Sequence, residues 1–321
     1  MTRVVALTPN PAWDVTYRVD RLLPGESLRV RSVVARAGGK GVNVARVVRA
    51  LGFASVAVCP LGGPLAGPFA DDLDADGQPA AVVPVAGAVR QSVAVVPAEA
   101  GAEDGGHPTV LNEPGPALDD AEWAALVAAC VAQVGTAPAA VVATVSGSLP
   151  PGTTHERVVG LVGALRAAGA RVHVDVSGPG LVWAAEAGAD LVKPNRSELV
   201  EATGVDDPAR AVGELLRRGA RAVVVTDGER GLTAYEAGPD GPASPAVVGR
   251  ARLAAPVAGN PTGAGDAAMA ALAVDPDQPW AHRLALAAAT SAAAVLQPVA
   301  GAVDRADVDR LLTHVVTEPE S

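Results

Sequence analysis

The chain has 321 residues and a formal net charge of −10, and aromatic side chains make up only 2% of it. This length suits one large α/β domain, or a large domain with a small partner. The acidic balance without a basic tract argues against nucleic acid as a partner, and no apolar run free of glycine, proline or charge reaches the ~18 residues of a membrane span.

The first residues run quickly into a proline turn. RVVALTPNP predicts a short buried strand, and it lacks the apolar core of a signal peptide, so we expect a cytoplasmic protein without membrane contact. Cys59 and Cys130 lie in apolar runs, and we expect buried thiols there rather than a disulfide.

Short apolar runs alternate with helical patterns along most of the chain. Further strands are expected near residues 55, 140, 171, 190 and 221. Helical periodicity predicts helices over 118–134, 154–168, 207–218, 264–273, 279–296 and 304–316. This alternation predicts an α/β fold whose mainly parallel central sheet is covered by helices on both faces.

Two stretches, about 12–36 and 81–112, break this rhythm. Both show strand-like alternation without a helix, so together they predict a small β-sheet set apart from the main sheet, as a lid or a dimer surface. The acidic segment AEAGAEDGGH within the second stretch is expected to be an exposed hairpin tip. Asp14 and Arg90 lie in these stretches, where Asp14 suits sugar hydroxyls and Arg90 suits a phosphate.

GGKGVNVARVVRALG, residues 38–52, is a glycine loop that opens a helix. Free N–H groups and the positive end of the helix dipole attract an anion there, and Lys40 adds a full charge. Val42 is on the predicted apolar face of this helix, whereas Arg46 and Arg49 are expected to point outward. Gly52 suits the C-terminal cap.

Three strand ends carry polar groups suited to binding. SGSLPPG, 146–152, offers two hydroxyls to a polar substrate, and VTDGERG, 225–231, is a glycine turn of the kind that binds nucleotides in open α/β sheets. VKPNRSEL, 191–199, places Lys193, Asn195 and Glu198 where a strand gives way to a helix. Asn195 and Glu198 suit Mg²⁺ held through waters, although the same pair also predicts a helix capping box. Lys40 and Lys193 are the only lysines of the chain.

GNPTGAGDAAMAAL, 259–272, puts a lone carboxylate behind a loop with almost no side chains. The backbone of Gly263, Ala264 and Gly265 can approach a phosphate closely, and its N–H groups suit the charge of a phosphoryl group in transfer. Asp266 beside that group is placed to accept a proton from an attacking hydroxyl, and it also suits a helix cap. The glycine spacing also matches a dinucleotide fingerprint, but no clear strand leads into it.

Six motifs, TPNPAWD, GGKGVNVA, NEPGP, SGSLPPG, KPNRSE and PTGAGD, resemble in order and spacing those of the ribokinase-like (PfkB) carbohydrate kinases. The closest resemblance is to the branch with 1-phosphofructokinase and tagatose-6-phosphate kinase, and it spans essentially the whole chain. It implies a single ribokinase-like domain over 1–321, a three-layer α/β/α fold with a β lid, a homodimer through that lid, and use of ATP and Mg²⁺.

The same resemblance implies a role for each motif residue. Asp266 is the expected base, with Gly263, Ala264 and Gly265 as the anion hole and Glu198 near the metal. The expected sugar-phosphate residues are Asp14, Gly38, Gly39, Lys40, Asn43, Arg90, Ser146 and Ser148. The expected ATP residues are Lys193, Asn195, Thr226, Gly228 and Gly231.

The expected reaction is phosphorylation of fructose 1-phosphate to the 1,6-bisphosphate, because Lys40 together with Arg90 favours a phosphorylated sugar. Tagatose-6-phosphate or 6-phosphofructokinase activity, a non-catalytic sugar-phosphate sensor and a dinucleotide oxidoreductase are the alternatives. Ala267, Pro261, the segment AVRQSV around Arg90 and the turn TDG depart from the branch pattern and leave the acceptor open.

Overall fold

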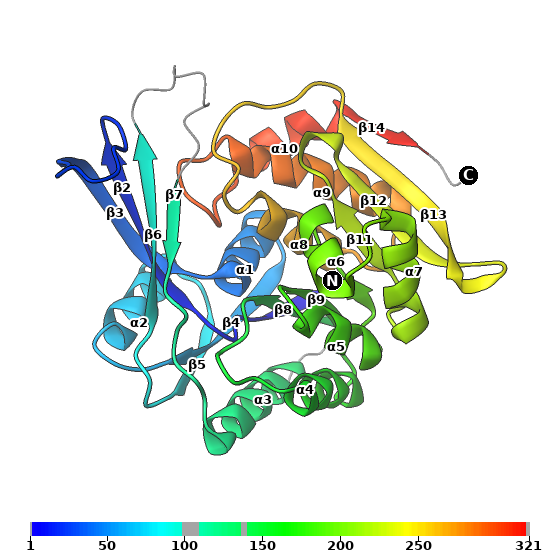
Figure 1. The fold of residues 1–321 in the computed structure, drawn as a ribbon, viewed down its shortest axis with the longest axis horizontal. Helices are drawn as coiled ribbons and strands as arrows, with labels where there is room; N and C mark the ends of the chain where they lie inside the picture. Colours follow the sequence, from blue (N-terminus) through cyan, green and yellow to red (C-terminus); the bar gives the residue numbers. More distant parts are fainter. Residues whose placement is uncertain (1, 98–108, 136–139, 319–321) are drawn as a thin grey trace.

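A ten-stranded sheet runs through the centre of the computed structural model, which describes residues 2–97, 109–135 and 140–318 (Figure 1). The strand order is β14-β13-β12-β11-β10-β9-β8-β1-β4-β5. Neighbours from β11 to β5 pair in parallel, whereas β12, β13 and β14 are antiparallel additions at one edge. The strands are β1 Arg3–Leu7, β4 Ala54–Leu61, β5 Ala80–Pro84, β8 Val141–Gly147, β9 Arg171–Val176, β10 Leu191–Val192, β11 Val223–Thr226, β12 Leu232–Gly238, β13 Gly241–Leu253 and β14 Val315–Glu318.

Helices cover both faces of this sheet, so the predicted three-layer α/β fold is confirmed. Val4 and Ala6 of β1 join one buried cluster with α1, α8, α9 and α10, while Val5 and Leu7 join a second with α3, α4, α5 and α7. The helices are α1 Lys40–Ala50, α2 Ala66–Ala75, α3 Asp120–Gly135, α4 His155–Ala167, α5 Gly180–Glu186, α6 Arg196–Thr203, α7 Pro208–Arg218, α8 Ala264–Val274, α9 Trp280–Val295 and α10 Arg305–Leu312. None of these helices is long and apolar enough to cross a membrane.

A separate four-stranded sheet, called here the lid sheet, stands to one side (Figure 1). Its order is β3-β2-β6-β7, built from β2 Ala12–Val19, β3 Val30–Gly38, β6 Arg90–Pro97 and β7 Thr109–Asn112. The lid sheet therefore draws on both stretches that break the helical rhythm of the sequence.

Two expected boundaries differ in the structure. β5, at the start of the expected lid stretch 81–112, pairs with β4 in the main sheet. The helix expected over 304–316 was wrong at its end, because α10 stops at Leu312 and the β-branched run that follows pairs with β13 as strand β14. The acidic hairpin tip expected at 98–107 lies outside the described residues.

Candidate active site

A cavity of about 690 Å³ lies between the lid sheet and the carboxyl ends of the parallel strands. This is the edge of an open α/β sheet where ligands bind. Thirteen of the residues expected in the site line it, from elements far apart in the sequence. They are Asp14, Gly39, Lys40, Asn43, Arg90, Ser148, Lys193, Asn195, Glu198, Thr226, Gly263, Gly265 and Asp266.

Five expected residues do not line the cavity: Gly38, Ser146, Ala264, Gly228 and Gly231. Ser146 is fully buried within β8, so the expectation that it meets the substrate finds no support in its position. A Cβ on Gly231 would stand 2.1 Å from the carbonyl oxygen of Ala251, so packing against β13 explains this glycine. A Cβ on Gly38 would stand 2.0 Å from Asp14 Oδ2, so Gly38 makes room for that carboxylate.

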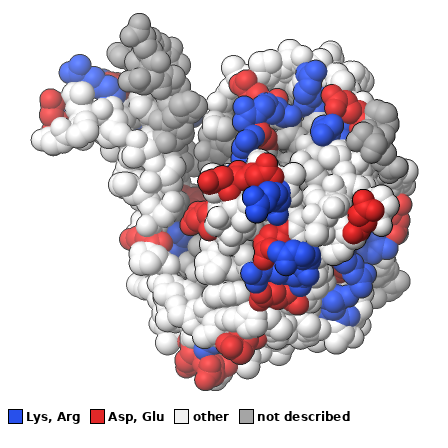
Figure 2. Space-filling model, turned by 45° about the vertical axis from the view of Figure 1, so that its right-hand side comes forward, with Lys and Arg blue, Asp and Glu red and all other residues white. Residues whose placement is uncertain are grey.

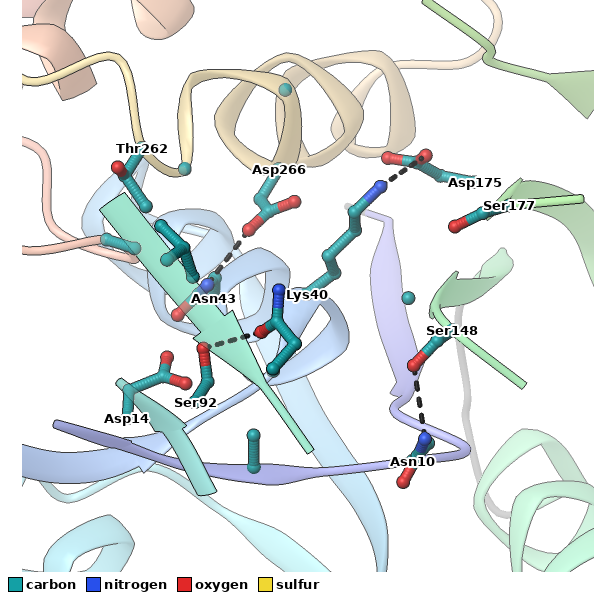
Figure 3. A pocket seen from close by; sticks show the side chains of 18 of the residues that line it. Asn10, Asp14, Lys40, Asn43, Ser92, Ser148, Asp175, Ser177, Thr262 and Asp266 are labelled. Atoms are coloured by element: carbon teal, nitrogen blue, oxygen red, sulfur yellow. Dashed lines mark hydrogen bonds and ion pairs between the residues drawn. The ribbon is translucent and has the colours of Figure 1, made fainter. Parts of the chain in front are cut away.

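Asp266 lies in the first turn of α8, which begins after Gly263 at φ +86°. Its side chain is 6% exposed, and Asn43 Nδ2 donates a hydrogen bond of 2.8 Å to its Oδ2 (Figure 3). Burial raises the pKa of Asp266 to about 7, against the opposing effect of the Lys40 ammonium. A carboxyl group with such a pKa can exchange a proton near neutral pH.

Both lysines of the chain meet at Asp175, a residue that the sequence did not single out. Lys193 Nζ lies 2.9 Å from Asp175 Oδ2, and Lys40 Nζ lies 3.3 Å from its Oδ1. Burial alone would raise the pKa of Asp175, but the two ammonium groups hold it below its usual value. Asp175 also raises the pKa of Lys40, which keeps that ammonium group charged. The cavity therefore has a fixed positive centre beside Asp266.

Asn195 and Glu198 form the capping box at the start of α6. Asn195 Oδ1 accepts from Glu198 N at 2.9 Å, and Glu198 Oε2 accepts from Asn195 N at 2.8 Å. The other oxygen of Glu198 faces Lys40 Nζ at 3.5 Å. Among the described residues no group of three acidic, cysteine or histidine side chains could hold a metal. Glu198 Oε1, which lies in the cavity beside Lys40, fits Mg²⁺ held mainly by water and phosphate, as that ion prefers.

Side chains on the lid side of the cavity are held in position by hydrogen bonds, mostly to backbone carbonyls. Arg90 Nη1 donates to Glu113 O at 3.0 Å, and Asn10 Nδ2 donates to Pro114 O at 2.9 Å and to Ser148 Oγ at 3.1 Å (Figure 3). Asp14 lies in the same region. Burial raises the pKa of Asp14 to about 6, although the N–H of Gly39 and the charge of Arg90 oppose the rise.

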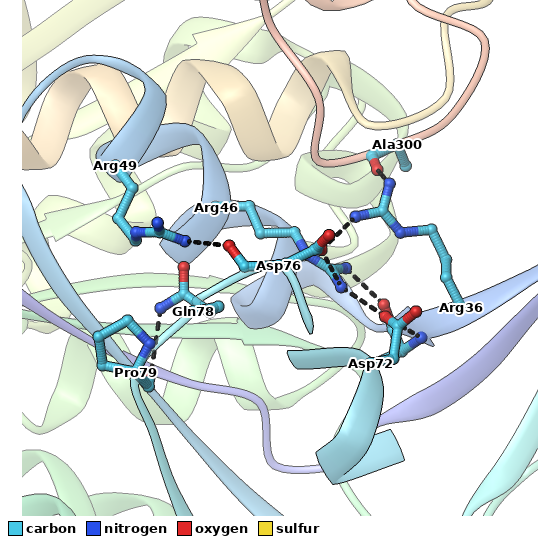
Figure 4. Close-up of polar contacts among 9 residues, drawn as sticks. Arg36, Arg46, Arg49, Asp72, Asp76, Gln78, Pro79 and Ala300 are labelled. Atoms are coloured by element: carbon cyan, nitrogen blue, oxygen red, sulfur yellow. Dashed lines mark hydrogen bonds and ion pairs between the residues drawn. The ribbon is translucent and has the colours of Figure 1, made fainter. Parts of the chain in front are cut away.

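Arg46 is buried, so the expectation that it points outward was wrong (Figure 4). Its guanidinium reaches Asp72 at 2.7 Å and Asp76 at 2.8 Å and also bonds to the carbonyl of Ala37. Asp72 in turn accepts from Ala37 N at 3.0 Å. The end of β3 is thus held through both backbone groups of Ala37, immediately before the glycine loop that shapes the cavity.

Sequence reasoning missed several lining residues, among them Asp175, Ser92 and Ser177. Asp175 ends the strand RVHVDV and is followed by Ser-Gly, and position at a strand end was the signal that could have found it. Charges elsewhere are mixed: acidic and basic side chains are interspersed over the face shown in Figure 2.

Comparisons with known proteins agree over nearly the whole chain. The family model described as pfkB family carbohydrate kinase matches residues 4–305. The ATP-dependent 6-phosphofructokinase isozyme 2 of Mycobacterium tuberculosis is 32% identical over 326 residues, covering 99% of this chain and 91% of that protein. The 1-phosphofructokinase of Xanthomonas campestris is 37% identical over 281 residues, which cover 84% of this chain and 83% of that protein. The phosphofructokinase-2 structure from Escherichia coli with fructose-6-phosphate superposes with a TM-score of 0.81 at 28% identity. The superposition covers 98% of this chain and 99% of that one.

Proposed function

The chain belongs to the pfkB family of carbohydrate kinases, and from this premise we propose that it transfers the γ-phosphoryl group of ATP to a hydroxyl of a ketohexose phosphate. Fructose 1-phosphate is the acceptor that we place first, with the 1,6-bisphosphate as product. Relatives named 1-phosphofructokinase support this choice, whereas those named 6-phosphofructokinase isozyme 2 keep fructose 6-phosphate as the alternative.

The cavity divides into two halves that suit the two substrates. Asp14, Arg90 and Ser148 line the half below the lid sheet, where hydroxyl and phosphate oxygens of a sugar can be bound. Lys193, Asn195 and Thr226 line the other half, at the ends of β10 and β11. We assign ATP to this half, because nucleotides bind at the carboxyl ends of the strands in open α/β sheets. Asp266 and Lys40 lie where these halves meet.

The observation that carries the proposal is the buried carboxylate of Asp266 at the first turn of α8. Its hydrogen bond from Asn43 fixes the carboxylate, and its pKa of about 7 lets it take a proton from the attacking hydroxyl. The Asp266 carboxylate would otherwise repel a phosphate, so the proton-accepting role accounts for its place in the cavity.

Backbone N–H groups and a lysine together can stabilise the negative charge on the transferred phosphoryl group. A Cβ on Gly265 would face Lys193 Nζ at 3.6 Å, so the glycine leaves space between the helix start and this ammonium. The N–H groups at 263–265 and Lys193 can then approach the same phosphate oxygens. Mg²⁺ would supply further neutralisation of the phosphate oxygens when it is bound, with Glu198 near it.

We expect the activity to fall as the pH drops below about 7. Asp266 must be deprotonated to act as a base, and its pKa lies about there, so kcat/KM should decrease about tenfold per pH unit below it. The measurement is kcat/KM for the sugar phosphate from pH 5 to pH 9 at saturating ATP. A flat profile down to pH 5 would contradict the role of Asp266.

ADP release with MgATP and a panel of acceptors tests the proposed function. The panel is fructose 1-phosphate, fructose 6-phosphate, tagatose 6-phosphate, fructose and ribose. Turnover of one phosphorylated ketose is expected. Turnover of unphosphorylated sugars alone would overturn the assignment of the acceptor, and sugar-phosphate binding without any turnover would indicate a sensor instead of a kinase.

The lid sheet also carries the proposed homodimer contact. Val33 and Leu111 are 57% and 59% exposed, and the strand register places Leu111 on the face opposite Asp14. Val33 and Leu111 lie on the same face, on the two edge strands of the lid sheet. We expect a second copy to cover this face, because a sheet face with large exposed aliphatic groups marks an interaction surface. Light scattering should give twice the mass of the chain, and a monomeric mass would contradict this arrangement.

A further inference from the structure

One polar residue from each strand of the lid sheet lies in a single row. Asp14 of β2 pairs in register with Arg36 of β3 and with Ser92 of β6, and Ser92 pairs with Asn112 of β7. Residues that pair directly across strands point to the same face of a sheet. We call Arg36, Asp14, Ser92 and Asn112 the lid row.

The lid row faces the cavity. Asp14, Ser92 and Asn112 line it, and Figure 3 shows Asp14 and Ser92 side by side across from Asp266. The next row on the same face, two residues along each strand, is Val34, Thr16, Ala94 and Val110, of which only Val110 lines the cavity. That row is small and largely apolar, so the polar groups are concentrated at the substrate end of the lid sheet.

Hydrogen bonds fix which polar atoms the row presents. Ser92 Oγ donates to Asn112 Oδ1 at 2.8 Å. This bond uses the hydroxyl hydrogen of Ser92 and orients the amide of Asn112, so Asn112 retains its two N–H donors and Ser92 retains acceptor capacity. Asp14 adds a carboxylate acceptor one strand away, roughly 4.8 Å across the sheet.

Arg36 anchors the other end of the row to the core. Its guanidinium donates to Asp76 at 3.1 Å and to the carbonyl of Ala300 at 3.4 Å (Figure 4). Ala300 also lines the cavity and packs on Gly263, where a Cβ would meet that of Ala300 at 2.8 Å. The lid row is therefore held in position relative to the loop that opens α8.

We propose that Asn112 and Ser92 are specificity-determining residues that recognise the acceptor, an inference that rests on the proposed function. The amide of Asn112 donates to an oxygen of the phosphorylated sugar, and Ser92 accepts from one of its hydroxyls. Asp14 and Asn112 are separated by two strand spacings, about 10 Å, so the row can contact the sugar and its phosphate group together. A neutral donor at 112 favours a phosphate, whereas a carboxylate at that position would repel one.

The test compares Asn112→Asp and Ser92→Ala with the wild-type chain. Asn112→Asp replaces the donor by a negative charge at nearly constant size. We expect it to raise KM for the preferred sugar phosphate by at least about tenfold, while KM for ATP stays within about twofold. Ser92→Ala releases the amide from its fixed orientation and should raise the same KM by a smaller factor. Gln91→Glu is the control, since Gln91 carries its exposed side chain on the opposite face of β6.

A binding measurement separates recognition from structural support. Calorimetric titration with the sugar phosphate, without nucleotide, should show the same loss of affinity in Asn112→Asp, and thermal unfolding should match that of the wild type. An unchanged KM for the sugar phosphate, or an equal rise in the KM values for sugar phosphate and ATP, would overturn this inference and leave the proposed function standing. If Asn112→Asp does not fold, an unchanged KM in Ser92→Ala overturns it. Lack of turnover by the wild-type chain with every sugar phosphate would overturn the proposed function, and this inference with it.

Discussion

Replacing Asp266 by asparagine is expected to lower kcat by about 10²–10⁴-fold, the usual contribution of a positioned general base. Asparagine keeps the size of the side chain and an oxygen that can accept from Asn43, so the cavity should retain its shape. It cannot accept the proton of the attacking hydroxyl. KM for ATP and for the sugar phosphate should therefore change much less than kcat.

The same substitution should stabilise the folded chain. Burial raises the pKa of Asp266 to about 7, so the folded state favours the protonated carboxyl group, and stability is lost as the pH rises from the ordinary value of 3.8 through 7. At pH 8 the penalty is almost fully present, and a shift of about three pKa units corresponds to about 4 kcal/mol. The amide introduced by Asp266→Asn carries no charge, so the gain in thermal stability should be large at pH 8 and small at pH 4.

Asp304→Asn provides the matched control. Asp304 caps α10, accepts from the N–H of Ala306 and does not line the cavity. Asparagine caps a helix about as well as aspartate, so neither activity nor stability should change appreciably. If Asp266→Asn kept most of its kcat, or lost stability at pH 8, the assignment of a buried carboxylate base would be wrong.

Replacing Asp175 by asparagine is expected to have the second largest effect, this time on stability. The change removes the counter-charge of Lys193, which is only 3% exposed, and one of two partners of Lys40. Breaking a buried ion pair in this way costs about 3–5 kcal/mol. The measurement is urea unfolding with and without MgATP, whose phosphates should restore part of the loss by pairing with the uncovered lysines.

Asp175→Asn should also move the pH profile. Asp175 raises the pKa of Asp266, so its removal should shift the acid limb of kcat/KM to lower pH. The ionisation of the sugar phosphate is the same for both proteins, so it cannot cause such a shift. The control Asp277→Asn breaks an exposed pair with Arg171, at the other end of β9, and should cost at most about 1 kcal/mol. Equal stability of Asp175→Asn and Asp277→Asn would contradict the role of Asp175 as the buried counter-charge of Lys40 and Lys193.

Local sequence patterns were sufficient to predict most of the strands and helices of the parallel core. The helix over 38–52 follows from a glycine loop and an apolar face, and Gly52 adopts φ +89° just after the helix, as its position predicted. Patterns of this kind do not show which side chains from distant parts of the sequence a residue contacts in the fold. Arg46 was placed outward because nothing in its own helix reveals Asp72 and Asp76, which α2 and the residue after it supply. β14 was assigned to a helix because its pairing with β13 is a contact far apart in sequence.

The site shows the same division. Asp266, Lys40 and Lys193 stand out through rarity and through glycines beside them, and the cavity brings them together. Asp175 occurs in an alternating strand, where a carboxylate usually faces solvent, and only sheet order places it between the two lysines. Ser92 is an ordinary strand residue in the sequence, and only the register of the lid sheet shows that it lies in one row with Asp14 and Asn112.

The central claim is that this cavity transfers a phosphoryl group from ATP to a sugar phosphate with Asp266 as the base. Phosphorus-31 NMR of the products formed from MgATP and the preferred ketose phosphate tests it most directly, in parallel for the wild type and Asp266→Asn. The account predicts ADP and a sugar with two phosphomonoester signals from the wild type, and almost none from the variant. ADP with inorganic phosphate and an unchanged sugar, or bisphosphate formed equally by both proteins, would contradict it.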